Sequence, residues 1–142
     1  MKPKEKSIQE LENDFWPDQN EYPTGLVERC HRYRKIKIKD LQIHQIITLL
    51  IQDIGSDYLM PIVLERMNKD ISEEDDYDGS SFLESIDFFS DEIFKRNPEL
   101  HKATIHLLDR KQTDIENLVG WKRYEKIKRK IEETYNMFKN GS

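Results

Sequence analysis

Apolar residues near the C-terminus recur with the period of an α-helix, and this pattern constrains the fold more than any other feature. Six of them are separated by three or four positions, which places them on one face of a helix of about five turns. They are Trp121, Tyr124, Ile127, Ile131, Tyr135 and Phe138. Lys and Arg fill much of the remaining circumference. The pattern predicts a helix that buries this stripe in the core.

Helix signals also dominate the rest of the 142 residues. The apolar positions from 41 to 54 cover much of a helix circumference, which is typical of a central buried helix, and Asp40 is placed to cap it. Capping-box patterns begin at Ser7, Ser81 and Thr113. We therefore predict an all-α single compact domain over residues 1–142, with about seven to nine short and medium helices and no significant β-sheet.

The charge is unevenly distributed along the chain. The net charge is −5, but residues 70–92 contain ten acidic residues and no Lys or Arg. They are Asp70, Glu73, Glu74, Asp75, Asp76, Asp78, Glu84, Asp87, Asp91 and Glu92. Like charges at this density repel one another. The segment is either a solvated loop and helix face or a surface that meets a basic partner, and such a surface would repel nucleic acid.

Several classes of enzyme are excluded by residues that the chain lacks. The single cysteine, Cys30, allows no intramolecular disulfide and no zinc site built from several thiolates. The five glycines form neither a dinucleotide-binding pattern nor a P-loop pattern. No signal peptide and no membrane-spanning segment is evident. We therefore expect a cytoplasmic protein with no catalytic residue, no metal and no cofactor.

Two alternatives remain open. Glu28 and His31 have the spacing of a helical metal-binding pair, although no second Glu-x-x-His occurs, and a metal-dependent helical enzyme would use them. Residues 29–39 carry six basic residues and no acid, and residues 121–139 carry seven basic residues and three acids. A small RNA-binding helical module would use these two basic stretches.

Three stretches of the sequence are familiar together. The first combines residues 10–16 (ELENDFW) with 26–34 (LVERCHRYR), the second runs from 40 to 55 and on through 58–65, and the third is 73–79 (EEDDYDG) before an apolar helix. In this order and spacing they resemble the immunity proteins of bacterial contact-dependent growth inhibition systems. The resemblance covers roughly residues 8–95, and residues 96–142 carry no matching motif.

The resemblance implies an all-helical cytoplasmic protein without catalytic activity. Such proteins bind the C-terminal toxin domain of a delivered effector from the same locus and block it, and the branch that this chain resembles is associated with ribonuclease toxins. We therefore expect a monomer that forms a 1:1 complex with a basic nuclease toxin domain and that binds neither nucleic acid nor a membrane.

The acidic stretch then predicts the toxin-binding surface. A nuclease needs a basic cleft that holds phosphates, and a carboxylate-rich surface would fit that cleft. The predicted surface comprises Glu73, Glu74, Asp75, Asp76, Tyr77 and Asp78, extended by Glu84 and Asp87 on the following helix. A buried anchor is also needed, and the candidates are Tyr77, Tyr58, Phe82 and Trp16. The family pattern has Asp where this chain has Ser80.

Overall fold

The computed structural model describes the backbone of residues 3–141 and the side chains of residues 3–134. Within these limits the chain forms nine α-helices and three short 3-10 helices. The β-type pairing in this part of the chain is one isolated antiparallel bridge between Ser7 and Lys37, and residues 3–141 form no sheet. The predicted all-α fold is confirmed.

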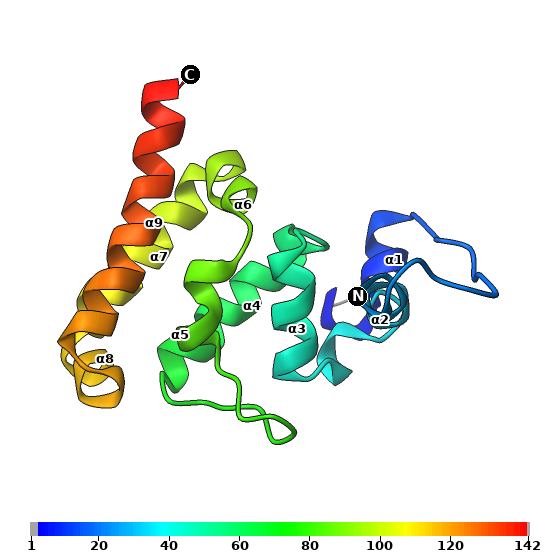
Figure 1. The fold of residues 1–142 in the computed structure, drawn as a ribbon, viewed down its shortest axis with the longest axis horizontal. Helices are drawn as coiled ribbons and strands as arrows, with labels where there is room; N and C mark the ends of the chain where they lie inside the picture. Colours follow the sequence, from blue (N-terminus) through cyan, green and yellow to red (C-terminus); the bar gives the residue numbers. More distant parts are fainter. Residues whose placement is uncertain (1–2, 142) are drawn as a thin grey trace.

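The helices follow one another across the molecule, from α1 and α2 at one end to α7, α8 and α9 at the other (Figure 1). The first half contains η1 (Pro3–Glu5), α1 (Ile8–Glu12), α2 (Gly25–Tyr33), η2 (Ile38–Asp40), α3 (Ile43–Ile51) and α4 (Ser56–Lys69). The second half contains α5 (Phe82–Ser85), η3 (Ile86–Phe88), α6 (Asp91–Arg96), α7 (Pro98–Arg110), α8 (Gln112–Val119) and α9 (Trp121–Gly141). Helix α4 joins the two halves, because it packs against α3 and against α7.

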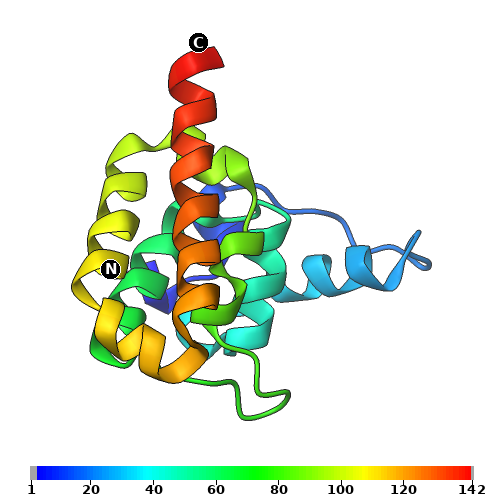
Figure 2. The ribbon, with the colours of Figure 1, turned by 60° about the vertical axis from the view of Figure 1, so that its left-hand side comes forward.

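The core is centred on α3 and α4, as the apolar run from 41 to 54 predicts. Leu49 and Leu50 of α3 and Leu59 and Val63 of α4 are fully buried. Residues of α5, α6, α7 and α9 extend the same buried cluster toward the C-terminus. Helix α9 lies beside α7 and η3 along the outer side of the molecule (Figure 2).

The apolar stripe of the last helix is buried in its central part. Tyr124, Ile127 and Ile131 are at most 3% exposed, as predicted. The prediction is wrong for Trp121, which is 57% exposed. Trp121 is the first residue of α9, and helical side chains lean toward the N-terminus, so its ring projects beyond the packed part of the helix. The side chains of Tyr135 and Phe138 lie outside the described residues.

Local capping signals were only partly reliable. The capping box at Ser7 forms, and the Ser81 hydroxyl accepts a hydrogen bond from the backbone N–H of Glu84. The other two predictions are wrong. Gln42, not Asp40, precedes α3, and Asp40 instead ends the 3-10 helix η2. The Thr113 box falls inside α8, which starts at Gln112 directly after α7.

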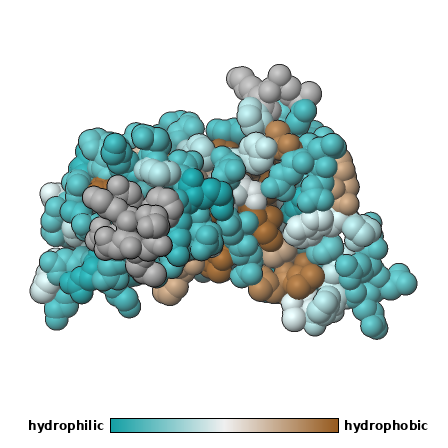
Figure 3. Space-filling view, turned by 90° about the horizontal axis from the view of Figure 1, so that it is seen from above, coloured by the Kyte–Doolittle hydropathy of each residue, from teal (hydrophilic) through white to brown (hydrophobic). Residues whose placement is uncertain are grey.

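Polar residues cover most of the face shown in Figure 3, and apolar groups appear there only in separate patches. No helix in the described part of the chain is both long enough and apolar enough to cross a membrane.

Candidate functional site

The acidic loop, which we define as residues 70–81, connects α4 to α5 and lies at the lower edge of the molecule in both ribbon views (Figures 1 and 2). It is organised around the carboxylate of Asp75, which is 6% exposed. One oxygen of Asp75 accepts hydrogen bonds from the backbone N–H groups of Tyr77 (2.7 Å) and Asp78 (3.2 Å). The other accepts from the backbone N–H of His44 (2.9 Å) and lies 2.9 Å from His44 Nδ1.

Asp75 thereby caps α3, which begins 32 residues earlier in the chain. His44 lies in the first turn of α3, where backbone N–H groups have no partner within the helix and a negative charge is stabilised. Burial by itself raises the pKa of Asp75, but the hydrogen bonds from His44, Tyr77 and Asp78 outweigh it and lower the pKa to about 2. Because an ionised carboxylate only accepts, Nδ1 of His44 carries a proton in this pair.

Further hydrogen bonds fix the rest of the loop. Asp78 accepts from the backbone N–H (2.9 Å) and the hydroxyl (2.6 Å) of Ser80. The backbone N–H of Asp75 donates to the carbonyl of Ser80 (2.7 Å), and Gly79 supplies the left-handed turn between them with φ +75°. This network presents Tyr77 outward, where its ring is 82% exposed and lies 5.2 Å from the ring of His44.

The predicted acidic residues divide into two sets. Glu74, Asp76 and Asp78 are exposed and have no ion-pair partner within residues 3–134. The others are held by hydrogen bonds or ion pairs, Asp75 as described above and the remaining three by arginines from outside the acidic segment. Glu73 forms a bidentate ion pair with Arg66 (2.6 and 3.0 Å). Arg123 of α9 binds both Asp87 (2.8 and 3.0 Å) and Glu84 (2.9 Å).

The structure separates the four candidate anchors clearly. Tyr77 lies on the surface beside the exposed acids. Phe82 is 2% exposed and belongs to the core, so it is not available to a partner. Tyr58 is partly buried, and its hydroxyl donates to the carbonyl of Leu11 (3.4 Å). Trp16 is also partly buried, beneath the guanidinium of Arg34 at 3.9 Å.

Two open hollows flank the acidic loop. On one side, a hollow of about 520 Å³ lies over the Arg66–Glu73 pair and includes Asp76. On the other side, a hollow of about 480 Å³ is bounded by α2, by His44 of α3 and by Tyr77 and Asp78 of the loop. The loop therefore contributes to two concave surfaces, and both of them are lined by basic and acidic side chains.

The residues that hold the carboxylates of Asp75, Glu73 and Asp87 were not identified from the sequence. His44 lies in an apolar run, Arg66 at the end of a mixed helix and Arg123 in a lysine-rich one. No local spacing connects them to the acidic stretch, since the partners of His44 and Arg123 are more than 30 residues away.

Glu28 and His31 do not converge on a metal-binding arrangement. Glu28 is exposed, whereas His31 is buried, with its ring 4.9 Å from Trp16 and 4.8 Å from Tyr22. In the described part of the chain, the side chains closest to a metal-binding arrangement are His44, Asp75 and Asp78, whose ligand atoms lie within 4.8 Å of one another. The His44 and Asp75 atoms are already hydrogen-bonded to each other.

The two parts of the first familiar stretch meet around Arg34, which is 1% exposed. Its Nη2 donates to Glu12 (3.0 Å) and to the carbonyl of Asp14 (2.7 Å), and its guanidinium covers Trp16. These contacts give residues 10–16 and 26–34 a structural role, because they hold the segment after α1 against α2.

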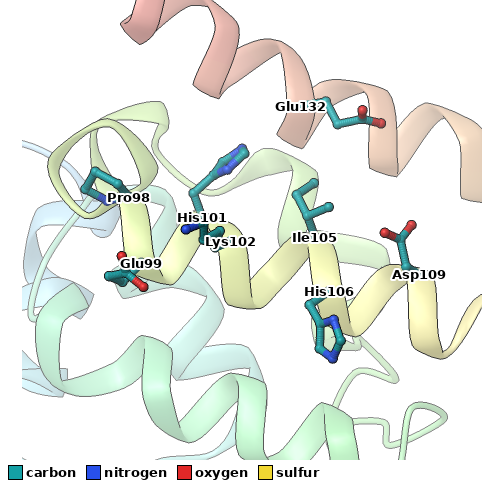
Figure 4. Close-up of a pocket in the computed structure, with 8 residues that line it drawn as sticks. All are labelled: Pro98, Glu99, His101, Lys102, Ile105, His106, Asp109 and Glu132. Carbon is teal, nitrogen blue, oxygen red and sulfur yellow. The ribbon is translucent and has the colours of Figure 1, made fainter.

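A separate hollow of about 440 Å³ lies between α7 and α9 (Figure 4). His101 and Ile105 point toward α9, whereas His106 points away from it. His101 is buried, and its Nε2 lies 2.7 Å from the carbonyl oxygen of Ile131. None of the predicted site residues lines this hollow.

A family model described as CDI immunity proteins matches residues 10–104. The matched region contains α2, α3, α4 and the whole acidic loop, and it ends within α7. No curated protein and no solved structure matches the chain.

Proposed function

This chain belongs to the CDI immunity proteins, and we propose that it binds the toxin domain of a contact-dependent growth inhibition effector and neutralises it by direct contact. In this role it is an inhibitor without catalysis of its own. We place its action in the cytoplasm, as a monomer in a 1:1 complex with the toxin domain.

The observation that carries the proposal is the family match across the fold and the acidic loop. Within that region, Glu74, Asp76 and Asp78 project unpaired charge around one exposed aromatic ring, Tyr77. An exposed aromatic side chain among charges is typical of protein interfaces, where the ring supplies affinity and the charges supply steering and selectivity.

We further propose that the toxin is a nuclease. A nuclease presents a cationic surface to its phosphate substrate, and the exposed carboxylates of the acidic loop are complementary to such a surface. Their unpaired state supports this assignment, because carboxylates already held by arginine, as Glu73 and Asp87 are, contribute less attraction.

The contact residues follow from exposure. We assign toxin contact to Glu74, Asp76, Tyr77 and Asp78. Asp75 is a positioning residue, because both oxygens of its carboxylate already accept hydrogen bonds that fix the conformation of the loop. Glu73, Glu84 and Asp87 lie at the periphery of the surface, with Arg66 and Arg123 bound to them.

The two alternatives receive less support from the geometry. A metal enzyme using Glu28 and His31 would need His31 at a site that metal and substrate reach, but the ring is buried between aromatic side chains. An RNA-binding module would need free cations. Several of the basic residues are instead paired with acids, namely Arg34, Lys35, Lys39, Arg123, Lys128 and Lys130.

The test is co-expression of this chain with the toxin domain of the effector encoded beside its gene. We expect growth of the host and co-purification of a 1:1 complex. The triple variant Glu74→Lys, Asp76→Lys, Asp78→Lys should weaken binding and change its salt dependence, because charge reversal opposes a cationic partner. A matched control reverses three exposed acids outside the acidic loop, Asp114 of α8 and Glu125 and Glu133 of α9. Cell death without a complex of two folded proteins would reject immunity to this toxin.

A further inference from the structure

Arg29 and Arg32 are two unpaired guanidinium groups beside the acidic loop. They are one turn apart on α2, so they project from the same face, and both are exposed. Neither has a carboxylate partner within residues 3–134. Four other arginines do have such partners in the same part of the chain, namely Arg34, Arg66, Arg96 and Arg123. The α2 pair is therefore free to bind an anionic group.

Both arginines line the 480 Å³ hollow that ends at Tyr77. Three rings form a continuous series along it, because the Tyr33 ring lies 6.5 Å from that of His44 and the His44 ring lies 5.2 Å from that of Tyr77. The guanidinium of Arg32 is 5.4 Å from the Tyr33 ring centroid. The series is held at its centre by Asp75, which fixes His44.

The charge around the hollow selects the kind of anion that fits. Asp78 lines the same hollow, and Asp76 is exposed two residues before it along the loop. A nucleic acid brings many phosphates, and these carboxylates would repel them. A single carboxylate on an otherwise cationic protein surface meets less repulsion, because it carries one negative charge and the cations around it attract Asp76 and Asp78; two guanidinium groups offer it charge-assisted hydrogen bonds.

Building on the proposed function, we propose that an acidic side chain of the toxin binds Arg29 and Arg32 in this hollow, beside Tyr77. The toxin-binding surface then has both signs of charge, with α2 supplying the positive part and the acidic loop the negative part. Such a surface rejects a toxin that is merely basic, because an unfilled arginine pair faces its cations. The α2 pair is in this way a specificity determinant that an acidic loop alone does not supply.

The experiment measures the affinity of the purified toxin domain for three forms of this chain. These are the wild type, the variant Arg29→Ala, Arg32→Ala and the control Arg129→Ala, which removes an exposed arginine of α9 distant from the hollow. We expect the α2 variant to weaken binding by about 10- to 100-fold and the control to leave it unchanged. Circular dichroism and the melting temperature establish that each variant is folded.

A second arm identifies the acidic group. Each exposed Asp and Glu of the toxin is replaced by Lys in turn and paired with the variant Arg29→Glu, Arg32→Glu. We expect one toxin variant to recover binding to this charge-reversed chain, and that toxin residue is the ligand. If none recovers binding, the proposal is wrong.

The remaining outcomes separate this inference from the proposed function. If the wild type forms no complex with the toxin, the proposed function fails. If the wild type binds and reversal of Glu74, Asp76 and Asp78 weakens the complex while the α2 variant binds normally, only the inference fails. The inference is also overturned if a labelled single-stranded RNA binds the wild type but not the α2 variant, because the arginine pair would then bind nucleic acid.

Discussion

Replacement of Asp75 by Asn tests whether the buried carboxylate of Asp75 stabilises the acidic loop. The wild-type carboxylate binds four donors, and its pKa is about 2 in the folded chain against an ordinary value of 3.8. Each pKa unit corresponds to about 1.36 kcal/mol, so ionisation of Asp75 contributes on the order of 2 kcal/mol to the free energy of unfolding. We expect Asp75→Asn to lose about this amount at pH 5, measured by urea denaturation.

The pH dependence of this loss has a definite sign. Because the folded pKa lies below the unfolded one, the contribution is complete above the unfolded value and disappears as the pH falls through the folded value. About half of it should remain at pH 3. The difference in unfolding free energy between the wild type and Asp75→Asn should therefore shrink by about 1 kcal/mol between pH 5 and pH 3.

The neighbouring residue provides the control for this prediction. Asp76 is exposed and accepts no hydrogen bond within residues 3–134, so Asp76→Asn should change the unfolding free energy by less than about 0.5 kcal/mol at either pH. The reasoning is refuted if Asp75→Asn and Asp76→Asn have equal stability, or if the Asp75→Asn deficit is the same at pH 5 and pH 3.

Three further predictions concern other parts of the fold. Arg123→Met should destabilise the protein by about 2–3 kcal/mol in urea denaturation, because it leaves the buried carboxylate of Asp87 without its cation. Gly79→Ala should lower the free energy of unfolding by about 1 kcal/mol in the same assay, because φ is +75° although the added Cβ meets open space. Gly55→Ala should lower it by at least about 2 kcal/mol, because φ is +65° and the added Cβ would also lie 2.6 Å from a side-chain carbon of α1. Burial raises the pKa of Cys30 despite the charge of Arg29, so the folded protein should react with a disulfide thiol reagent at least about tenfold more slowly than the urea-unfolded chain.

The fold was predictable because its determinants are local. Helical periodicity depends on residues three and four apart, and the central helices α3 and α4 bury the apolar positions that this periodicity selects. The errors occur at helix ends. Trp121 has the correct spacing, but its position as the first residue of α9 removes it from the neighbouring helices. Helix boundaries at Asp40 and Thr113 depend on the short connections to η2 and α7, which a capping pattern does not encode.

The candidate site could be predicted from the sequence only as a region. The excess of acidic residues correctly located a loop with exposed charge, since Glu74, Asp76 and Asp78 face solvent. The sequence alone did not distinguish these residues from Asp75, which carries the same charge but is buried. That difference arises from His44, which approaches the loop only after the chain has folded.

In the proposed complex, the inward and the outward carboxylates of the acidic loop should affect binding in different ways. The outward residues act over distance, so their removal should reduce the rate of association and its dependence on salt. Asp75 acts on the free protein, because the hydrogen bonds that it accepts hold Tyr77 in place before any partner arrives. A loop ordered in advance loses less conformational entropy when it binds, so a change at Asp75 weakens the complex without removing any contact across the interface. In the proposed complex, carboxylates of one short segment would therefore contribute in two ways, by attracting the partner and by fixing the surface that it meets.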